Sequence, residues 1–187
     1  MLHARHHGYP VPEVVEASGR DMVMERLEGD TMLSDLGRRP WHLQSHARML
    51  AGLLKRLHAL PVPPGLTPRH ACSTAIVHLD LHPDNVVLTP GGPVVIDWTN
   101  AGVGDPAVEM ADLWALFTCA EPPAAGRRER IVTRLGRRAF CALLLAHFDR
   151  ETIRGGLREA VDGRLADPNM TPRERDAMRR MAARHGL

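Results

Sequence analysis

Hydrophobic and polar positions follow two different patterns in the first third of the chain. Residues 13–17 and 21–27 are short apolar-rich runs separated by a turn at residues 18–20, which predicts a β-hairpin. Residues 43–60 instead repeat apolar side chains at three- and four-residue intervals, which predicts one amphipathic helix that stops at Pro61. The chain is therefore expected to open with a hairpin and continue into a helix.

The middle of the chain predicts short strands followed by a buried helix. Residues 75–78 form a brief apolar run, and residues 85–88 and 93–97 are apolar segments on either side of a Thr-Pro-Gly-Gly turn. Residues 106–119 are apolar on nearly every side, which is typical of a helix inside a core. We expect a second hairpin here and then a buried helix.

The last third predicts helices only. The apolar spacing favours helices over residues 128–148 and 151–165, the second weakened by two adjacent glycines. The sequence Thr-Pro-Arg-Glu at residues 171–174 is a capping box with proline at the first helical position, so it predicts a short final helix.

Composition narrows the classes of function. The chain has 187 residues, 44% hydrophobic and 25% charged, which suits one soluble domain. Its net charge is +2 and only 4% of residues are aromatic, so we expect no nucleic-acid partner, and the pairs Arg127-Arg128 and Arg137-Arg138 are interpreted as solvated helix faces. No signal peptide or long apolar run is present, which favours a cytoplasmic protein with no membrane partner. The three widely spaced cysteines are interpreted as reduced thiols.

The candidate chemistry lies in the sequence HLDLHPDN at residues 78–85 and in VVIDW at residues 94–98. These segments place Asp80, an Asn five residues later at Asn85, and a second carboxylate, Asp97, beyond the predicted hairpin. Kinase chemistry needs one carboxylate to orient the attacking hydroxyl, and an amide and a second carboxylate to hold Mg²⁺ on the phosphates. Protein kinases show the same interval between Asp and Asn and a later metal-binding Asp.

These segments resemble the catalytic region of the aminoglycoside phosphotransferase and choline kinase group, which are small-molecule kinases with a protein-kinase-like fold. That group favours the sequence HGDLHPGN, then IDW, then GDP. This chain has Leu79 and Asp84 where the group usually has Gly, keeps Gly-Asp-Pro at residues 104–106, and has Glu109 where Asp is more frequent. The resemblance runs from about residue 11 to residue 117 and is most specific in its central part.

The resemblance implies an α+β, protein-kinase-like fold. It implies a mostly helical C-lobe and, in this chain, only a two-strand remnant of the N-lobe, so the sequence looks N-terminally truncated. Residues 1–27 are expected to form the N-lobe remnant and hinge. Residues 28–187 are expected to form the C-lobe, with the catalytic loop and a helical acceptor-binding tail.

The implied activity is ATP-dependent transfer of a phosphoryl group to a hydroxyl of a small molecule, with Mg²⁺ as the metal. By resemblance, Asp80 is the base, His82 lies near the phosphates, and Asn85 and Asp97 are the metal ligands. Aminoglycoside, choline-like amino alcohol, homoserine and sugar acceptors all remain open.

The resemblance also assigns roles to backbone groups. Adenine is expected to bond to the Glu25 carbonyl and the Leu27 amide in the hinge. Asp105 is expected to bond the backbone of the catalytic loop, and His78 the backbone near Asp97.

Two parts of a kinase site are missing from the sequence. No Gly-rich phosphate loop precedes the catalytic segment, and the only lysine, Lys55, lies in a predicted helix. Either Met1 is an internal or misassigned start, or the chain is a truncated paralogue that is weakly active or a catalytically dead binding or scaffold protein. For the chain as given, we expect apolar surface around Val14, Val23 and Leu27 to be uncovered, which favours self-association or binding of a partner.

One alternative reading of the same residues is a metal-dependent hydrolase. His78, Asp80 and His82 alternate, and on a strand they would share one face, as metal ligands require. The proline and asparagine that follow fit a kinase loop better, but this alternative is not eliminated by the sequence.

Overall fold

The computed structural model describes residues 1–187 apart from residues 20, 67, 71 and 122–125, and it omits the side chains of residues 127–129. The last residue of the predicted turn at 18–20 and the side chains of Arg127 and Arg128 therefore lie outside the description. The described helices are α1 (Leu2–His6), α2 (Met32–Arg38), α3 (Leu43–His58), α4 (Pro106–Cys119), α5 (Arg127–Leu145), α6 (Arg150–Ala166) and α7 (Pro172–Arg184). The described strands are β1 (Val14–Ser18), β2 (Asp21–Met24), β3 (Asp30–Thr31), β4 (Ala75–Val77), β5 (Val86–Thr89), β6 (Gly92–Val95) and β7 (Gly102–Gly104).

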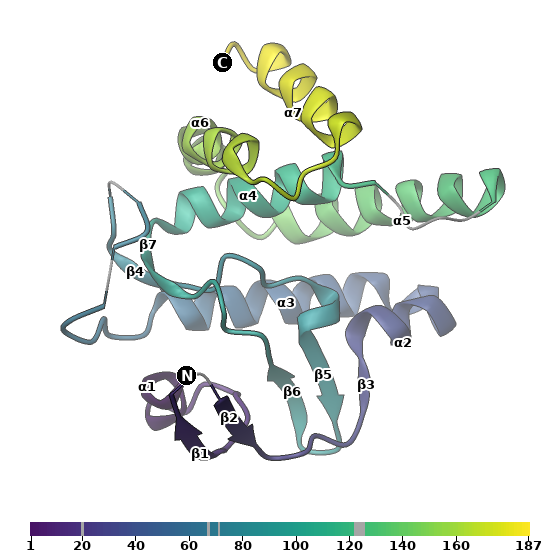
Figure 1. The fold of residues 1–187 in the computed structure, drawn as a ribbon. Helices are drawn as coiled ribbons and strands as arrows, with labels where there is room; N and C mark the ends of the chain where they lie inside the picture. Colours follow the sequence, from purple (N-terminus) through teal and green to yellow (C-terminus); the bar gives the residue numbers. More distant parts are fainter. Residues whose placement is uncertain (20, 67, 71, 122–125) are drawn as a thin grey trace.

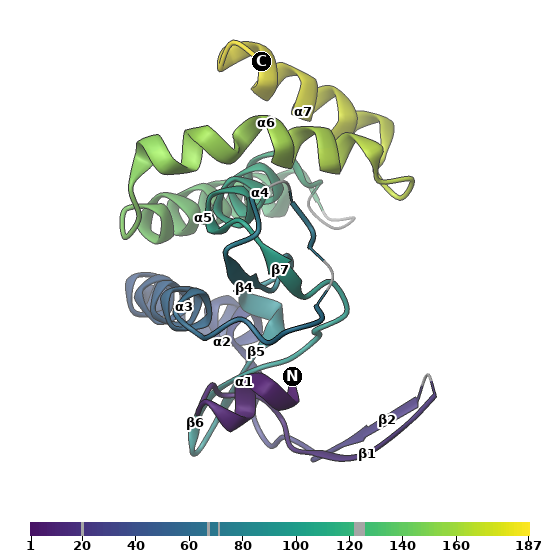
Figure 2. The ribbon, with the colours of Figure 1, turned by 90° about the vertical axis from the view of Figure 1, so that its left-hand side faces the viewer.

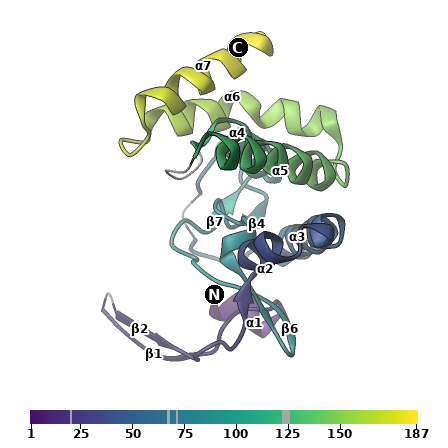
Figure 3. The same ribbon diagram turned by 90° about the vertical axis from the view of Figure 1, so that its right-hand side faces the viewer.

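The helices form two groups with the short strands β4 and β7 between them (Figure 1). Helices α4, α5, α6 and α7 lie on one side, and α2 and α3 lie on the other. The antiparallel β1–β2 hairpin lies at the opposite end of the molecule from α7, and it projects away from the remaining elements in Figures 2 and 3. The sequence predicted a two-stranded element before the hinge, and this hairpin corresponds to it.

The central strands pair antiparallel in two small sheets. One sheet has the order β3-β5-β6, with Val86 opposite Val95 in the β5–β6 hairpin. The other pairs β4 with β7, and all six of its residues are buried. These sheets hold both ends of the predicted catalytic segment.

Helix α3 supplies one wall of the core. The predicted apolar stripe is buried along its whole length, at positions Ala47, Leu50, Leu53, Leu54 and Leu57. The helix is amphipathic because its other face is exposed and polar, as the three- and four-residue spacing indicated.

Helix α4 lies in the group formed by α4, α5, α6 and α7, and α6 packs against its first turn. A Cβ atom built on Gly156 would come within 2.4 Å of the Ala107 carbonyl carbon, so only glycine allows this approach. We expected the adjacent glycines to weaken the helix, but α6 continues without a break from Arg150 to Ala166. Gly156 is a packing position between α4 and α6.

The pattern predicted most of the long elements and missed several short ones. Helix α4 has the predicted bounds, and α3, α5 and α6 begin and end within three residues of the expected positions. The capping box at Thr171 and Glu174 is formed. Helix α2 and strands β3 and β7 were not predicted, because two or three residues in a strand carry no measurable period.

Candidate active site

Three predicted site residues, Asp80, His82 and Asn85, lie together on one loop. The loop follows β4 and ends in a single 3₁₀ turn at residues 83–85, with proline at its first position. The Asn85 amide nitrogen donates to the Asp80 carbonyl oxygen at 2.9 Å and lies 3.4 Å from a carboxylate oxygen of Asp80. His82 Nε2 lies 3.5 Å from the other carboxylate oxygen. The loop therefore presents a half-buried carboxylate beside an amide and an imidazole.

The β5–β6 hairpin brings Asp97 back toward this loop. The Ile96 amide donates to the Asn85 carbonyl oxygen at 3.0 Å, so Asp97 is the next residue after a direct link to the loop. Its carboxylate accepts a hydrogen bond from the Thr99 hydroxyl at 2.8 Å. Asp97 has a φ of 58°, a left-handed conformation that Asp adopts more readily than most residues.

His78 lies behind the loop and bonds the backbone, as the resemblance implied. Its Nε2 lies 3.0 Å from the Ile96 carbonyl oxygen, next to Asp97. Burial lowers the pKa of His78, and the charges of Glu109, Asp80 and Asp97, together with the hydrogen bond to Ile96, oppose that shift. The predicted site carboxylates Asp80 and Asp97 thus both favour the protonated form of the His78 imidazole.

Glu109 holds the start of the loop from inside the protein. Its side chain is fully buried, and one carboxylate oxygen accepts from the His78 amide at 2.6 Å and the Leu79 amide at 2.7 Å. The other oxygen lies 2.5 Å from His58 Nε2 on α3. We assigned the loop-binding role to Asp105, and the structure corrects this. The Asp105 carboxylate accepts from the Ala107 amide as the N-cap of α4. A carboxylate in a mostly apolar helix was the available signal for Glu109.

Leu79 adopts a left-handed backbone conformation that favours glycine. Its φ is 61°, in the region where side chains are strained by about 1–2 kcal/mol. Glu109 accepts from the Leu79 amide and from the amide before it, so the buried carboxylate helps to hold Leu79 in this conformation.

The predicted hinge residues Glu25 and Leu27 lie between β2 and β3. The Glu25 amide donates to the Glu13 carbonyl oxygen at 2.9 Å, while the Glu25 carbonyl and the Leu27 amide bond no other described residue. Gly29 then passes so close to β5 that a Cβ there would lie 2.2 Å from the Leu88 carbonyl oxygen. The segment after the predicted hinge thus lies directly beside β5, the strand that follows the predicted catalytic loop.

The ammonium group of Lys55 contacts an aromatic ring. Lys55 lies on α3, as predicted, and its ammonium group is 5.3 Å from the centre of the Phe148 ring, in cation–π contact. Phe148 belongs to the connection between α5 and α6.

The donor atoms of this site fit Mg²⁺. The Asn85 amide nitrogen faces Asp80, which leaves the amide oxygen as an acceptor, and Asp97 adds carboxylate oxygens. Oxygen ligands from one or two carboxylates are what Mg²⁺ prefers in phosphoryl-transfer sites.

The hydrolase alternative has less support from the geometry. Among the described residues, the ligand atoms of His78, Asp80 and His82 do not gather within 4.8 Å of one another. The described group that does so is Asp35, His42 and His46, on α2 and α3.

Comparison with known proteins finds similarity in the central segment of the chain. Residues 65–155 match the Phosphotransferase enzyme family. Thiamine kinases from Salmonella paratyphi B and Salmonella newport are 39% identical over 87 residues, which is 44% of this chain. The match spans 29% of the length of those relatives.

Solved structures show the same fold. A thermostable mutant of aminoglycoside phosphotransferase APH(4)-Ia, in its apo form, superposes with a TM-score of 0.59 at 16% identity, over 96% of this chain and 82% of that one. A ternary complex of the same enzyme with AMP-PNP and hygromycin B gives 0.55 at 19% identity, over 100% of this chain and 81% of that one. The predicted α+β, protein-kinase-like fold is confirmed, and the match of residues 65–155 supports the predicted resemblance to the small-molecule kinases of the phosphotransferase family.

Proposed function

We propose that this chain provides the catalytic lobe of an ATP- and Mg²⁺-dependent phosphotransferase that acts on a hydroxyl of a small molecule. The observation that carries the proposal is the hydrogen bonding between Asn85 and Asp80, with Asp97 joined to the same loop through the Ile96 amide. A base and two oxygen ligands in this order are the parts that phosphoryl transfer requires.

Each residue has a role in the proposed reaction. Asp80 orients the acceptor hydroxyl and accepts its proton, and His82, beside Asp80, steadies the transferring group. Asn85 and Asp97 hold the metal, which neutralises charge on the phosphates when bound. The Glu25 carbonyl and the Leu27 amide, both free of bonds to other described residues, receive adenine. The division into residues 1–27 and residues 28–187 belongs to the same proposal.

The proposal predicts negligible phosphate transfer by the 187-residue chain alone. Its sequence has no Gly-rich loop before the hinge, and its one lysine contacts Phe148. Loss of phosphate-positioning groups costs orders of magnitude in rate. ATP turnover by the isolated chain should therefore stay at background, and nucleotide should add little to the stability that Mg²⁺ confers.

The decisive experiment adds a nucleotide-binding lobe to the chain. A nucleotide-binding lobe from an aminoglycoside phosphotransferase is joined before Glu25, and ADP release is measured with aminoglycoside, choline, homoserine, sugar and thiamine acceptors. Thiamine is included because the matched relatives are thiamine kinases. We expect acceptor-dependent ADP release that Asp80→Asn abolishes.

Asp84→Asn is the matched control. Asp84 is an exposed carboxylate on the same loop that accepts from the Thr31 hydroxyl at 2.8 Å, so it lies outside the proposed chemistry. This variant should keep the rate within a few-fold. ADP release that survives Asp80→Asn would refute the assignment, and zinc in the purified protein by elemental analysis would favour the hydrolase alternative.

A further inference from the structure

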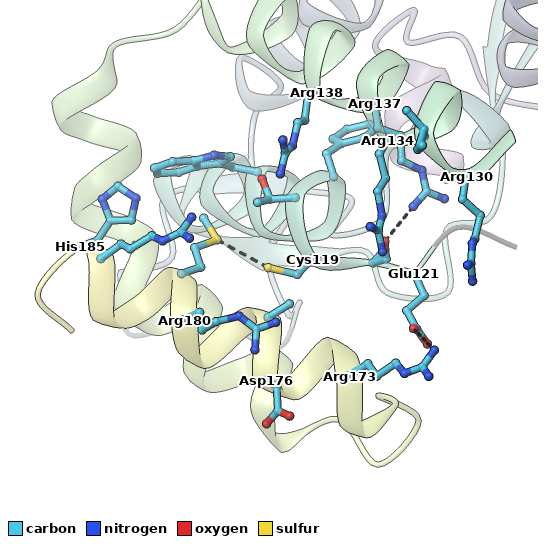
Figure 4. Close-up of a pocket in the computed structure, with 18 residues that line it drawn as sticks. Cys119, Glu121, Arg130, Arg134, Arg137, Arg138, Arg173, Asp176, Arg180 and His185 are labelled. Carbon is cyan, nitrogen blue, oxygen red and sulfur yellow. Dashed lines mark hydrogen bonds and ion pairs between the residues drawn. The ribbon is translucent and has the colours of Figure 1, made fainter. Parts of the chain in front are cut away.

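An arginine-lined groove of about 970 Å³ lies between α5 and α7, with α4 as its floor (Figure 4). Helix α5 contributes Arg130, Arg134, Arg137 and Arg138, and their spacing places them on one face of the helix. Helix α7 faces them with Arg173, Arg180 and Arg184. The sequence pattern assigned Arg137-Arg138 to a solvated face. Arg138 is exposed and Arg137 is half-buried, and both line the groove.

The groove has far more positive charge than its own residues neutralise. Seven arginines line it against two carboxylates, Glu121 and Asp176. Glu121 lies 3.5 Å from Arg173, and Asp176 lies 3.6 Å from Arg179, which is not a lining residue. Arg137 donates to the Ala120 carbonyl oxygen at 3.0 Å.

The side chains of the other five arginines make no hydrogen bond or ion pair with a described residue. They are Arg130, Arg134, Arg138, Arg180 and Arg184. Guanidinium groups facing one another across a groove repel, and each presents donors suited to phosphate or carboxylate oxygens. The arrangement is therefore unfavourable when empty and complementary to several negative charges.

The floor and one wall of the groove are apolar. Trp114 and Phe117 of α4 are half-buried there, and Ile131 of α5 is 50% exposed. A volume of this size matches the upper range of small-molecule sites rather than a macromolecular surface. The chemistry indicated is a compact ligand with an apolar or aromatic body and several anionic groups.

The groove is distinct from the catalytic loop. Glu109, near the start of α4, contacts the loop, while the groove begins at Trp114 and continues to Cys119. At the helical rise, these positions lie roughly 8–15 Å farther along the axis of α4. An ATP phosphate held by Asn85 and Asp97 would be at the other end of this helix.

We propose that the groove between α5 and α7 is a second ligand site, which binds a small organic polyanion with an aromatic or apolar body. The arginines of the two facing helices bind its anionic groups, and Trp114 and Phe117 contact its body. The site goes beyond the proposed phosphoryl transfer and does not depend on it.

Pyranine, a pyrene with three sulfonates, is a suitable probe because it combines both features and is fluorescent. Its anisotropy is measured during titration with the 187-residue chain, and inorganic tripolyphosphate is then added as a competitor. We expect saturable binding that weakens with added salt and that tripolyphosphate reverses.

Charge reversal on both walls locates the binding. Arg134→Glu with Arg180→Glu should weaken pyranine binding about tenfold or more, because two charge-assisted contacts become repulsive. The matched control is Arg48→Glu with Arg158→Glu, which makes the same charge change at exposed positions outside the groove. The control should bind within about twofold of the unmodified chain, after correction for net charge.

Thermal melting separates loss of the site from loss of the fold. The groove variant should melt at or above the temperature of the unmodified chain, because repulsion between arginines is relieved. The milder pair Arg134→Gln with Arg180→Gln should weaken binding less than charge reversal. Absence of pyranine binding, or an equal loss in the groove and control variants, would overturn the proposal.

Discussion

The β4–β7 pair beside the predicted catalytic loop and the N-terminal hairpin are both built from short antiparallel strands, yet only the first is buried. All residues of β4 and β7 are buried, whereas β2 is exposed throughout and β1 nearly so. Two-stranded ribbons are marginal alone, so each depends on what packs against it. The β4–β7 pair has helices on both sides and the buried Glu109 carboxylate beside it (Figure 1). The hairpin has no such cover among the described elements.

This difference in burial indicates that a side chain outside residues 78–85, Glu109, holds the predicted catalytic loop in place. Asp80, His82 and Asn85 are half-buried or buried on a loop whose first amides are fixed by α4. The predicted hinge segment, by contrast, is held by the backbone hydrogen bond from the Glu25 amide to the Glu13 carbonyl oxygen and by the close approach of Gly29 to β5.

The largest expected effect comes from removing Glu109. Glu109→Ala leaves two buried amides and His58 without their acceptor, so we expect the free energy of unfolding to fall by about 3–5 kcal/mol. Denaturant titration measures it. The hairpin control Val15→Ala, at a position 68% exposed, should change stability by less than about 0.5 kcal/mol. Equal losses in the two variants would remove the distinction between the regions.

A smaller effect is expected at the hairpin surface. Val23 is 53% exposed and Val14 and Leu27 are partly exposed, so the apolar surface expected from the sequence is present. We predict concentration-dependent self-association, which Val23→Glu should reduce while leaving the unfolding free energy within about 0.5 kcal/mol. Sedimentation velocity checks this. A monomer at all concentrations would show that the exposed surface does not drive association.

The sequence predicted what depends on local pattern and missed what depends on distant partners. The helix α3 stripe and the Thr171 capping box follow from spacing within one segment, and both are formed. The Glu109 network joins residues 30 or more positions apart, so no local period reveals it. The arginines of α5 face those of α7 only after the helices pack, so no local pattern reveals the groove between them. The roles given to Asp80, His82, Asn85 and Asp97 stay predictions.

The smallest expected effect is on the pH dependence of stability, and it compares a buried carboxylate of α2 with an exposed carboxylate of the hairpin. Hydrogen bonds from His42 and His46 lower the pKa of the buried Asp35 from 3.8 to about 2. Because folding lowers this pKa, the ionised Asp35 carboxylate stabilises the fold at pH values above the pKa of the unfolded state. This stability is lost as the pH falls from 3.8 toward 2. Asp35→Asn should reduce the slope of stability against pH in this window.

The matched control for this prediction is Asp21→Asn, at an exposed position of β2. Its slope should remain that of the unmodified chain in acid denaturation followed by circular dichroism. An unchanged slope in Asp35→Asn would mean that the contacts with His42 and His46 do not stabilise the fold.

Binding of Mn²⁺, used as a paramagnetic substitute for Mg²⁺, tests the central claim most directly. The claim is that Asn85 and Asp97 form a metal site beside Asp80, and electron paramagnetic resonance measures the free ion during titration of the 187-residue chain. We predict one bound ion per chain, an affinity about tenfold or more weaker in Asp97→Asn, and an affinity within about twofold of the original in Asp84→Asn. Equal affinities in the unmodified chain and in Asp97→Asn would contradict the account.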